Sequence, residues 1–184
     1  YKDKFESVSI AEPLLGEVGS DATVINADKE AVAKAITAAA VADAGFESLD
    51  AAKDAGTAFV FMGHGTAHVA KVTYSQMNTQ MQQLGYENVF IGTVEGEPEE
   101  TACEAVIEAV KAAGYTNVVL RPLMVVAGDH ANNDMAGSDE DSWKTMFEAA
   151  GFTVDCQIHG LGEIADVQAL YVAHTKAAID SLNA

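Results

Sequence analysis

The sequence repeats one unit, in which a short apolar run rich in β-branched residues is followed by a loop and an alanine-rich amphipathic segment. Such runs and segments are the signals of strands and helices. The expected strands are Val8–Leu15, Thr57–Met62, Asn88–Val94, Asn117–Val126 and Thr153–Ile158. The expected helices are Asp28–Ala44, His68–Leu84, Pro98–Ala113, a helix opened by Ser138 and ending at Ala150, and Asp166–Leu182. Regular alternation of this kind requires βαβ crossovers and therefore a parallel sheet with helices on both faces.

Glycine, proline and serine residues at the expected helix ends support these boundaries. Gly45, Gly85 and Gly114 each follow an expected helix, where glycine commonly ends one. Pro98 stands at an expected helix start, and Ser138 with Asp141 resembles a capping box. The sequence therefore predicts an α/β fold: one domain over residues 1–184, built on a doubly wound, mostly parallel sheet of about five strands.

The charge of the chain excludes two classes of partner. Its net charge is −18, from 28 acidic and 10 basic residues, and Arg121 is the only arginine. Nucleic-acid binding needs clustered Lys and Arg, and an acidic surface repels anionic lipids. Apolar runs are far shorter than the roughly 20 residues that a membrane span needs. We expect a cytoplasmic protein without nucleic-acid or membrane partners. An exported form stays open, because the sequence begins at Tyr1 rather than Met.

Several common sites can also be set aside. Cys103 and Cys156 lie far apart in the sequence, so they give no disulfide framework or cysteine-based zinc site, and both are expected to be buried as small apolar residues. The sequence contains no G-x-x-x-x-G-K-[ST] loop, no G-x-G-x-x-G loop and no G-x-S-x-G elbow. We therefore expect no organic cofactor.

Reactive side chains follow four successive expected strands, each beside a glycine. They are His64 after the second strand, Glu95 after the third, Asp129 and His130 after the fourth, and His159 and Glu163 after the fifth. Ligands of open parallel sheets bind at the carboxyl ends of the strands. Imidazole and carboxylate groups suit a divalent first-row metal ion, and they also suit acid–base chemistry near neutral pH. Each of these residues also has a structural explanation, such as a hydrogen bond within a loop for His64 or a place ahead of a helix for Glu95.

Two stretches resemble a known family. Phe61-Met62-Gly63-His64-Gly65, followed by His68, is similar to the first metal-site motif of the anaerobic cobaltochelatases, which are class II tetrapyrrole chelatases. The stretch from Pro122 to Ala136, with Gly128-Asp129-His130 at its centre, resembles their second and more distinctive motif. The similarity continues through Asp141-Ser142-Trp143-Lys144 and Gly160-Leu161-Gly162-Glu163.

The resemblance implies a metal site and a reaction. Carried onto this sequence, the family's metal ligands and catalytic residues fall on His64, Glu95 and His130, with His68, Asp129 and Glu163 as candidates for a second shell. The implied reaction is insertion of Co²⁺ into sirohydrochlorin during anaerobic cobalamin synthesis. Fe²⁺ and Ni²⁺ fit the same ligands. The alternatives are an iron-inserting enzyme of sirohaem synthesis and a carrier of metal or haem without catalysis.

The resemblance also implies a partner. Long members of the family have an N-terminal α/β domain ahead of the region seen here, and the tetrapyrrole lies between two such domains. We therefore expect a missing N-terminal domain, or a second copy of this chain, to complete the substrate cleft.

Overall fold

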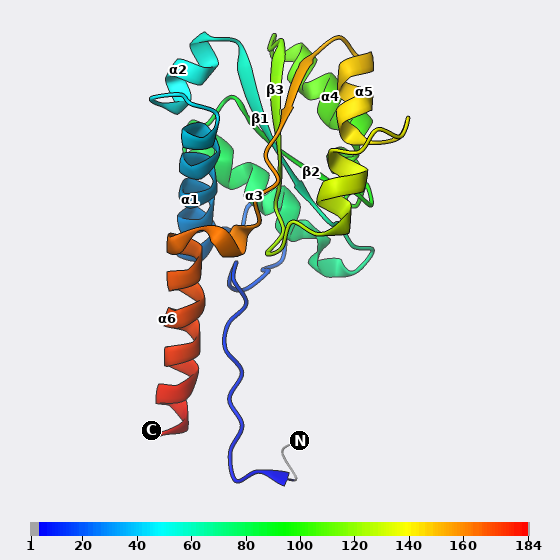
Figure 1. The fold of residues 1–184 in the computed structure, drawn as a ribbon. Helices are drawn as coiled ribbons and strands as arrows, with labels where there is room; N and C mark the ends of the chain where they lie inside the picture. The colour runs from blue at the N-terminus through cyan, green and yellow to red at the C-terminus, as the bar shows by residue number, and fades with distance from the viewer. Residues whose placement is uncertain (1–3, 184) are drawn as a thin grey trace.

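A computed structural model describes residues 4–183 of the chain, and its strands form one parallel sheet in the order β2-β1-β3-β4 (Figure 1). The strands are β1 (Thr57–Gly63), β2 (Val89–Thr93), β3 (Asn117–Pro122) and β4 (Thr153–Cys156). The helices are α1 (Ala27–Asp43), α2 (Leu49–Asp54), α3 (Val72–Gln83), α4 (Cys103–Ala112), α5 (Trp143–Ala149) and α6 (Ala165–Leu182). Short helical turns are η2 (Val69–Lys71), η3 (Glu99–Thr101), the π-helical η4 (Ala131–Met135) and η5 (Leu161–Glu163).

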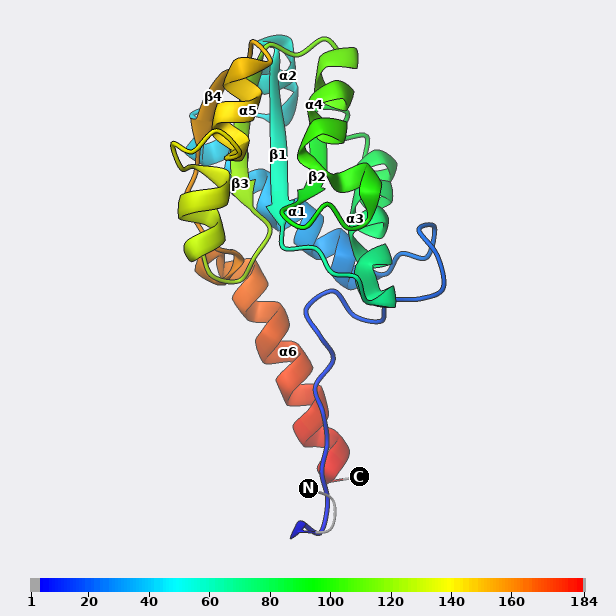
Figure 2. The same cartoon turned by 90° about the vertical axis from the view of Figure 1, so that its right-hand side faces the viewer.

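Both faces of the sheet are covered, as predicted (Figures 1 and 2). Every residue of the central strand β1 is buried. Phe59 and Phe61 pack with α1, α2 and α3 on one face. Val60 and Met62 pack with α4 and α5 on the other. Because successive side chains of a strand point to opposite faces, a strand covered on both sides must be apolar throughout. This is why its run could be recognised in the sequence.

The expected first strand is wrong. Residues 8–13 lie outside the sheet and run beside α6, where Ser9 Oγ and Ser181 Oγ are 2.8 Å apart, and Leu14 and Leu15 form a turn (Figure 1). A β-branched run becomes a strand only where a neighbouring strand pairs with it, and Ile10 is instead 89% exposed. The described residues therefore form four strands rather than five.

Several boundaries also differ from the prediction. β3 ends at Pro122, and β4 ends at Cys156. Ser138 does not cap α5; Ser142 does, by accepting a hydrogen bond from the Thr145 amide at 3.3 Å. Helix α2, capped by Ser48, was not expected. The helices expected from His68 and from Pro98 begin instead as short 3₁₀ turns ahead of α3 and α4.

One helix extends beyond the rest of the fold. α6 has 18 residues, of which only Val167 is buried, and its C-terminal half projects past the sheet (Figures 1 and 2). Among residues 4–183 no helix is both long enough and apolar enough to cross a membrane.

Candidate metal and substrate site

The structure brings His64 and His130 together at the carboxyl edge of the sheet. His64 follows β1 directly, and His130 lies just before η4, in the segment that follows β3. Their rings meet edge to face, with centroids 4.7 Å apart and planes at 84°. Two histidines separated by 66 positions in the chain are neighbours because β1 and β3 are adjacent parallel strands. The prediction that both histidines lie at one sheet edge is confirmed.

Each ring uses its Nδ1 atom within the protein. His64 Nδ1 lies 2.9 Å from the Gly65 carbonyl oxygen, which can only accept a hydrogen bond. His130 Nδ1 lies 2.5 Å from Asp134 Oδ2. A protonated Nδ1 leaves the lone pair of Nε2 free to bind a metal ion. Carboxylates that hold a ligating histidine in this way orient the ring and raise its basicity.

Asp134, which contacts His130, was not among the candidates taken from the sequence, whose second-shell acids were Asp129 and Glu163. Asp129 instead accepts a hydrogen bond from the Asn133 side chain at 2.7 Å. The signal for Asp134 was present in the sequence. It stands four residues after His130, and a helical turn brings positions i and i+4 together.

Glu95 joins the site through its backbone. Its amide donates to the His64 carbonyl oxygen at 2.9 Å, and a Cβ atom added to Gly65 would lie 2.9 Å from the Glu95 Cβ. The exposed Glu95 side chain lines a polar cavity of about 370 Å³ that Asp134 also lines. Within residues 4–183, no three His, Cys, Asp or Glu side chains form a ready metal-binding group. The pair of histidines is thus assembled, and Glu95 stands beside it.

The other candidates make local contacts. His68 Nδ1 accepts from the Ala70 amide at 3.1 Å and so caps η2. Glu163 accepts from His159 Nδ1 at 2.9 Å and from the Gly160 amide at 2.7 Å. The hydrogen bond from His159, followed by the one from Gly160, lowers the pKa of the Glu163 carboxyl. His68 and Glu163 therefore each stabilise the turn in which they lie.

Burial disfavours the thiolate form of both cysteines. It raises the pKa of the Cys103 thiol to about 12 and that of Cys156 to about 11. Metal ions bind thiolates, so this burial makes the two thiols poorer ligands than exposed ones. Cys103 is buried, as predicted, and Cys156 is partly buried.

Tyr74 of α3 supports the loop that carries His64. The Gly65 amide donates to Tyr74 Oη at 3.0 Å. A Cβ atom added to Gly63 would lie 2.4 Å from Tyr74 Cε1, so only glycine lets the ring pack against the strand end. The tyrosine thereby fixes the backbone on both sides of His64.

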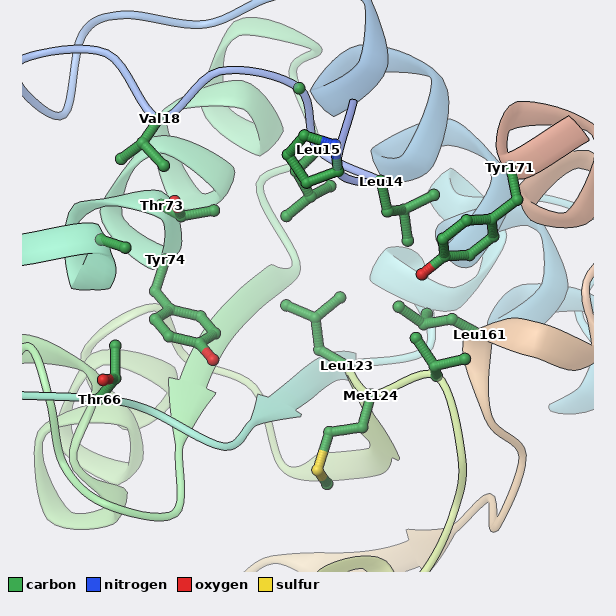
Figure 3. Close-up of a pocket in the computed structure, with 14 residues that line it drawn as sticks. Leu14, Leu15, Val18, Thr66, Thr73, Tyr74, Leu123, Met124, Leu161 and Tyr171 are labelled. Atoms are coloured by element: carbon green, nitrogen blue, oxygen red, sulfur yellow. The ribbon is translucent and has the colours of Figure 1, made fainter. Parts of the chain in front are cut away.

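A largely apolar cavity of about 460 Å³ opens beside this loop (Figure 3). Its walls come from three parts of the chain: the segment before α1, the region from Thr66 to Tyr74, and the loop after β3, with Leu161 and Tyr171 closing one end. The lining residues are Pro13, Leu14, Leu15, Gly16, Val18, Thr66, Ala70, Thr73, Tyr74, Leu123, Met124, Val125, Leu161 and Tyr171. Apolar walls next to a few polar groups are typical of sites for organic ligands.

Comparison with known proteins gives consistent matches. The family model described as cobalt chelatase (CbiK) matches residues 1–180. A sirohydrochlorin cobaltochelatase of Salmonella typhimurium is 42% identical over 121 residues, which are 66% of this chain and 44% of that protein. Sirohydrochlorin cobaltochelatase CbiKC of Nitratidesulfovibrio vulgaris is 30% identical over 181 residues, which are 98% of this chain and 57% of that protein.

The chain thus spans about half the length of the curated relatives that it matches. Among solved structures, a cobalamin biosynthesis CbiX protein of Marinobacter aquaeolei VT8 aligns with a TM-score of 0.49 and 17% identity. That alignment covers 69% of this chain and 98% of the other.

Proposed function

Because the chain belongs to the cobalt chelatase (CbiK) family, we propose that it inserts Co²⁺ into sirohydrochlorin, with His64, Glu95 and His130 as the residues that receive the metal and carry out the reaction. The observation that supports this most directly is the pair of histidine rings 4.7 Å apart, each with Nδ1 engaged within the protein. Each Nε2 then keeps a lone pair with which to bind a metal ion, and imidazole suits first-row metals.

In the proposed reaction the protein holds the two substrates and removes protons. Co²⁺ binds His64 and His130, and the Glu95 carboxylate supplies negative charge. The macrocycle rests on the apolar cavity beside the His64 loop. Co²⁺ passes from the two imidazole nitrogens to the four nitrogens of the macrocycle, and two pyrrole N–H protons leave as it enters. We assign His64 as the base, because its Nε2 can accept one proton once it has released the metal, with the Glu95 carboxylate assisting by accepting the other; proton transfer at close range is what positioned side chains contribute.

The charge of the site limits how the substrate can be held. Sirohydrochlorin is a polycarboxylate and this chain has a net charge of −18. Lys71, a cation near the site, already pairs with Glu97 at 2.6 Å. We therefore assign apolar contact with the face of the macrocycle, rather than ion pairing of its carboxylates, as the main interaction within this chain.

The test is metal insertion under anaerobic conditions. Purified chain is incubated with sirohydrochlorin and Co²⁺, and the absorbance change of insertion is followed against a reaction without protein. We expect acceleration by the wild-type chain and none by His130→Ala. His159→Ala is the matched control, because this half-exposed histidine of the same sheet edge pairs with Glu163 instead. Equal rates for wild type and His130→Ala would refute the assignment.

The same insertion assay tests the two alternatives, an enzyme that inserts another metal and a carrier without catalysis. Faster insertion of Fe²⁺ than of Co²⁺ would indicate the sirohaem branch, and the same comparison with Ni²⁺ tests the third metal. Stoichiometric metal binding without catalysed insertion would indicate a carrier.

We also propose that a second α/β domain of the same family covers α6 and completes the cleft. Apolar side chains lie exposed along α6 and along the N-terminal segment beside it. They are Phe5, Val8, Ile10, Val172, Ile179 and Leu182. Tyr171, at the start of this surface, also lines the apolar cavity. Large apolar side chains exposed in one region of a protein surface commonly mark an interface.

The mass of the chain in solution tests this partner. A dimer that Ile179→Asp dissociates would identify a second copy of the chain. A monomer that binds a separately produced N-terminal domain of a long relative would identify that domain. A monomer that binds neither would contradict the proposal.

A further inference from the structure

A buried lysine holds the N-terminal segment against the fold. Lys29 of α1 is 0% exposed, and its Nζ donates to the carbonyl oxygens of Leu15 at 2.9 Å and Glu17 at 2.8 Å. Both partners are neutral carbonyls. Removing an ammonium group from water is expensive, and this burial lowers the pKa of Lys29. An apolar side chain could fill the same place without the free-energy cost of taking an ammonium group out of water. We therefore look for the role of this lysine in the hydrogen bonds that it donates.

Two further side chains bind the same segment. Asn26 Nδ2 donates to the same two carbonyls, at 3.0 Å to Leu15 and 3.3 Å to Glu17. Gln76 of α3, also buried, donates from Nε2 to the carbonyls of Val18 and Asp21. The segment lies outside the sheet, so it has no strand ladder to hold it. These side chains supply its attachments instead.

The backbone held in this way is one wall of the apolar cavity. Leu14, Leu15, Gly16 and Val18 line it on this side. Figure 3 shows Leu14, Leu15 and Val18 on one side of the cavity and Tyr74, Leu123 and Met124 on the other. Tyr74 also fixes the His64 loop, as described above. The position of the segment therefore sets the distance between this wall and the loop that carries His64.

We infer that Lys29 is a positioning residue for the tetrapyrrole: by holding the Leu15 and Glu17 carbonyls, it fixes the apolar wall against which the macrocycle binds. Lys29 is fully buried below the segment, so it acts through the wall and not on the substrate. The inference rests on the proposed function, since it assigns the cavity to the macrocycle.

The experiment compares Lys29→Met with the wild-type chain in three measurements. The first is titration with metal-free sirohydrochlorin, the second is titration with Co²⁺ alone, and the third is amide hydrogen exchange of residues 12–21. We expect sirohydrochlorin affinity to fall by about tenfold or more, because two buried hydrogen bonds to the wall are lost. Co²⁺ affinity should stay unchanged, and exchange should rise in residues 12–21. In insertion assays KM for sirohydrochlorin should rise while kcat at saturation changes little.

Two matched variants serve as controls. Lys34→Met removes another lysine of α1, but this one is exposed and pairs with Glu30, so it should behave as wild type. Lys29→Arg keeps the charge and the donors and should restore part of the affinity. Gln76→Leu tests the same wall from α3 if Lys29→Met does not fold, and it should also weaken sirohydrochlorin binding.

The outcomes are distinguishable. The inference would be overturned if Lys29→Met or Gln76→Leu bound sirohydrochlorin as tightly as wild type while amide exchange of residues 12–21 rose. The proposed function would still stand in that case. An equal loss of Co²⁺ affinity would also overturn it, because the defect would then be general. Failure of the wild-type chain to bind sirohydrochlorin at all would overturn the proposed function, and the inference with it.

Discussion

Replacing Asp134 by asparagine tests the histidine pair most sharply. The variant keeps the size of the side chain and removes the charge that accepts the 2.5 Å hydrogen bond from His130 Nδ1. Loss of a carboxylate that supports a ligating histidine typically costs roughly 10- to 100-fold in metal affinity. The His130 and Asp134 side chains are 38% and 44% exposed, so water screens their interaction. We therefore expect the lower end, about tenfold or about 1.4 kcal/mol of Co²⁺ binding free energy.

The assay is Co²⁺ titration of the chain by calorimetry, without tetrapyrrole. Asp129→Asn is the matched control, because its carboxylate belongs to the same helical region and contacts Asn133 rather than a histidine. The control should bind Co²⁺ like wild type. Unchanged affinity in Asp134→Asn, or an equal loss in Asp129→Asn, would refute the reasoning that Asp134 supports a metal ligand.

Three further predictions concern packing, thiol chemistry and pH. Gly63→Ala places a methyl group 2.4 Å from Tyr74 Cε1 and should lower the free energy of unfolding by about 1–3 kcal/mol in chemical denaturation. Cys103→Ala should leave Co²⁺ affinity unchanged in titration, because burial raises the pKa of this thiol to about 12 and so disfavours the thiolate that a metal ion binds. Glu163 has a lowered pKa when folded, so its stabilising effect is present above the ordinary value of 4.5 and is lost as pH falls through the folded value. The difference in Tm between wild type and Glu163→Gln should accordingly shrink in acid.

Each of these has its own control or contrary result. Gly128→Ala, where an added Cβ meets nothing within 4 Å, should be close to neutral, and an equal loss there would remove the steric explanation for Gly63. Weaker Co²⁺ binding by Cys103→Ala would show that the thiol takes part in the site. A constant Tm difference from neutral pH to pH 3 would contradict the proposed titration of Glu163.

The predicted fold and the observed fold agree where local and tertiary preferences coincide. β1 is apolar at nearly every position, because both of its faces are buried, and that pattern is visible without a structure. Gly45, Gly85 and Gly114 follow their helices with φ of 77°, 73° and 85°, conformations that glycine adopts without strain. The prediction of a strand at residues 8–15 was wrong because a β-branched run becomes a strand only where a neighbouring strand pairs with it.

The candidate site divides in the same way. The sequence by itself determined that histidines follow β1 and β3, and the parallel arrangement then placed both at one edge. Only the tertiary structure decided that the rings touch, that Asp134 rather than Asp129 supports His130, and that the segment before α1 forms a cavity wall. Those contacts join residues through side-chain direction and through packing between distant parts of the chain. Sequence periodicity indicates which face of a helix or strand is buried, but it does not indicate which residues pack against that face.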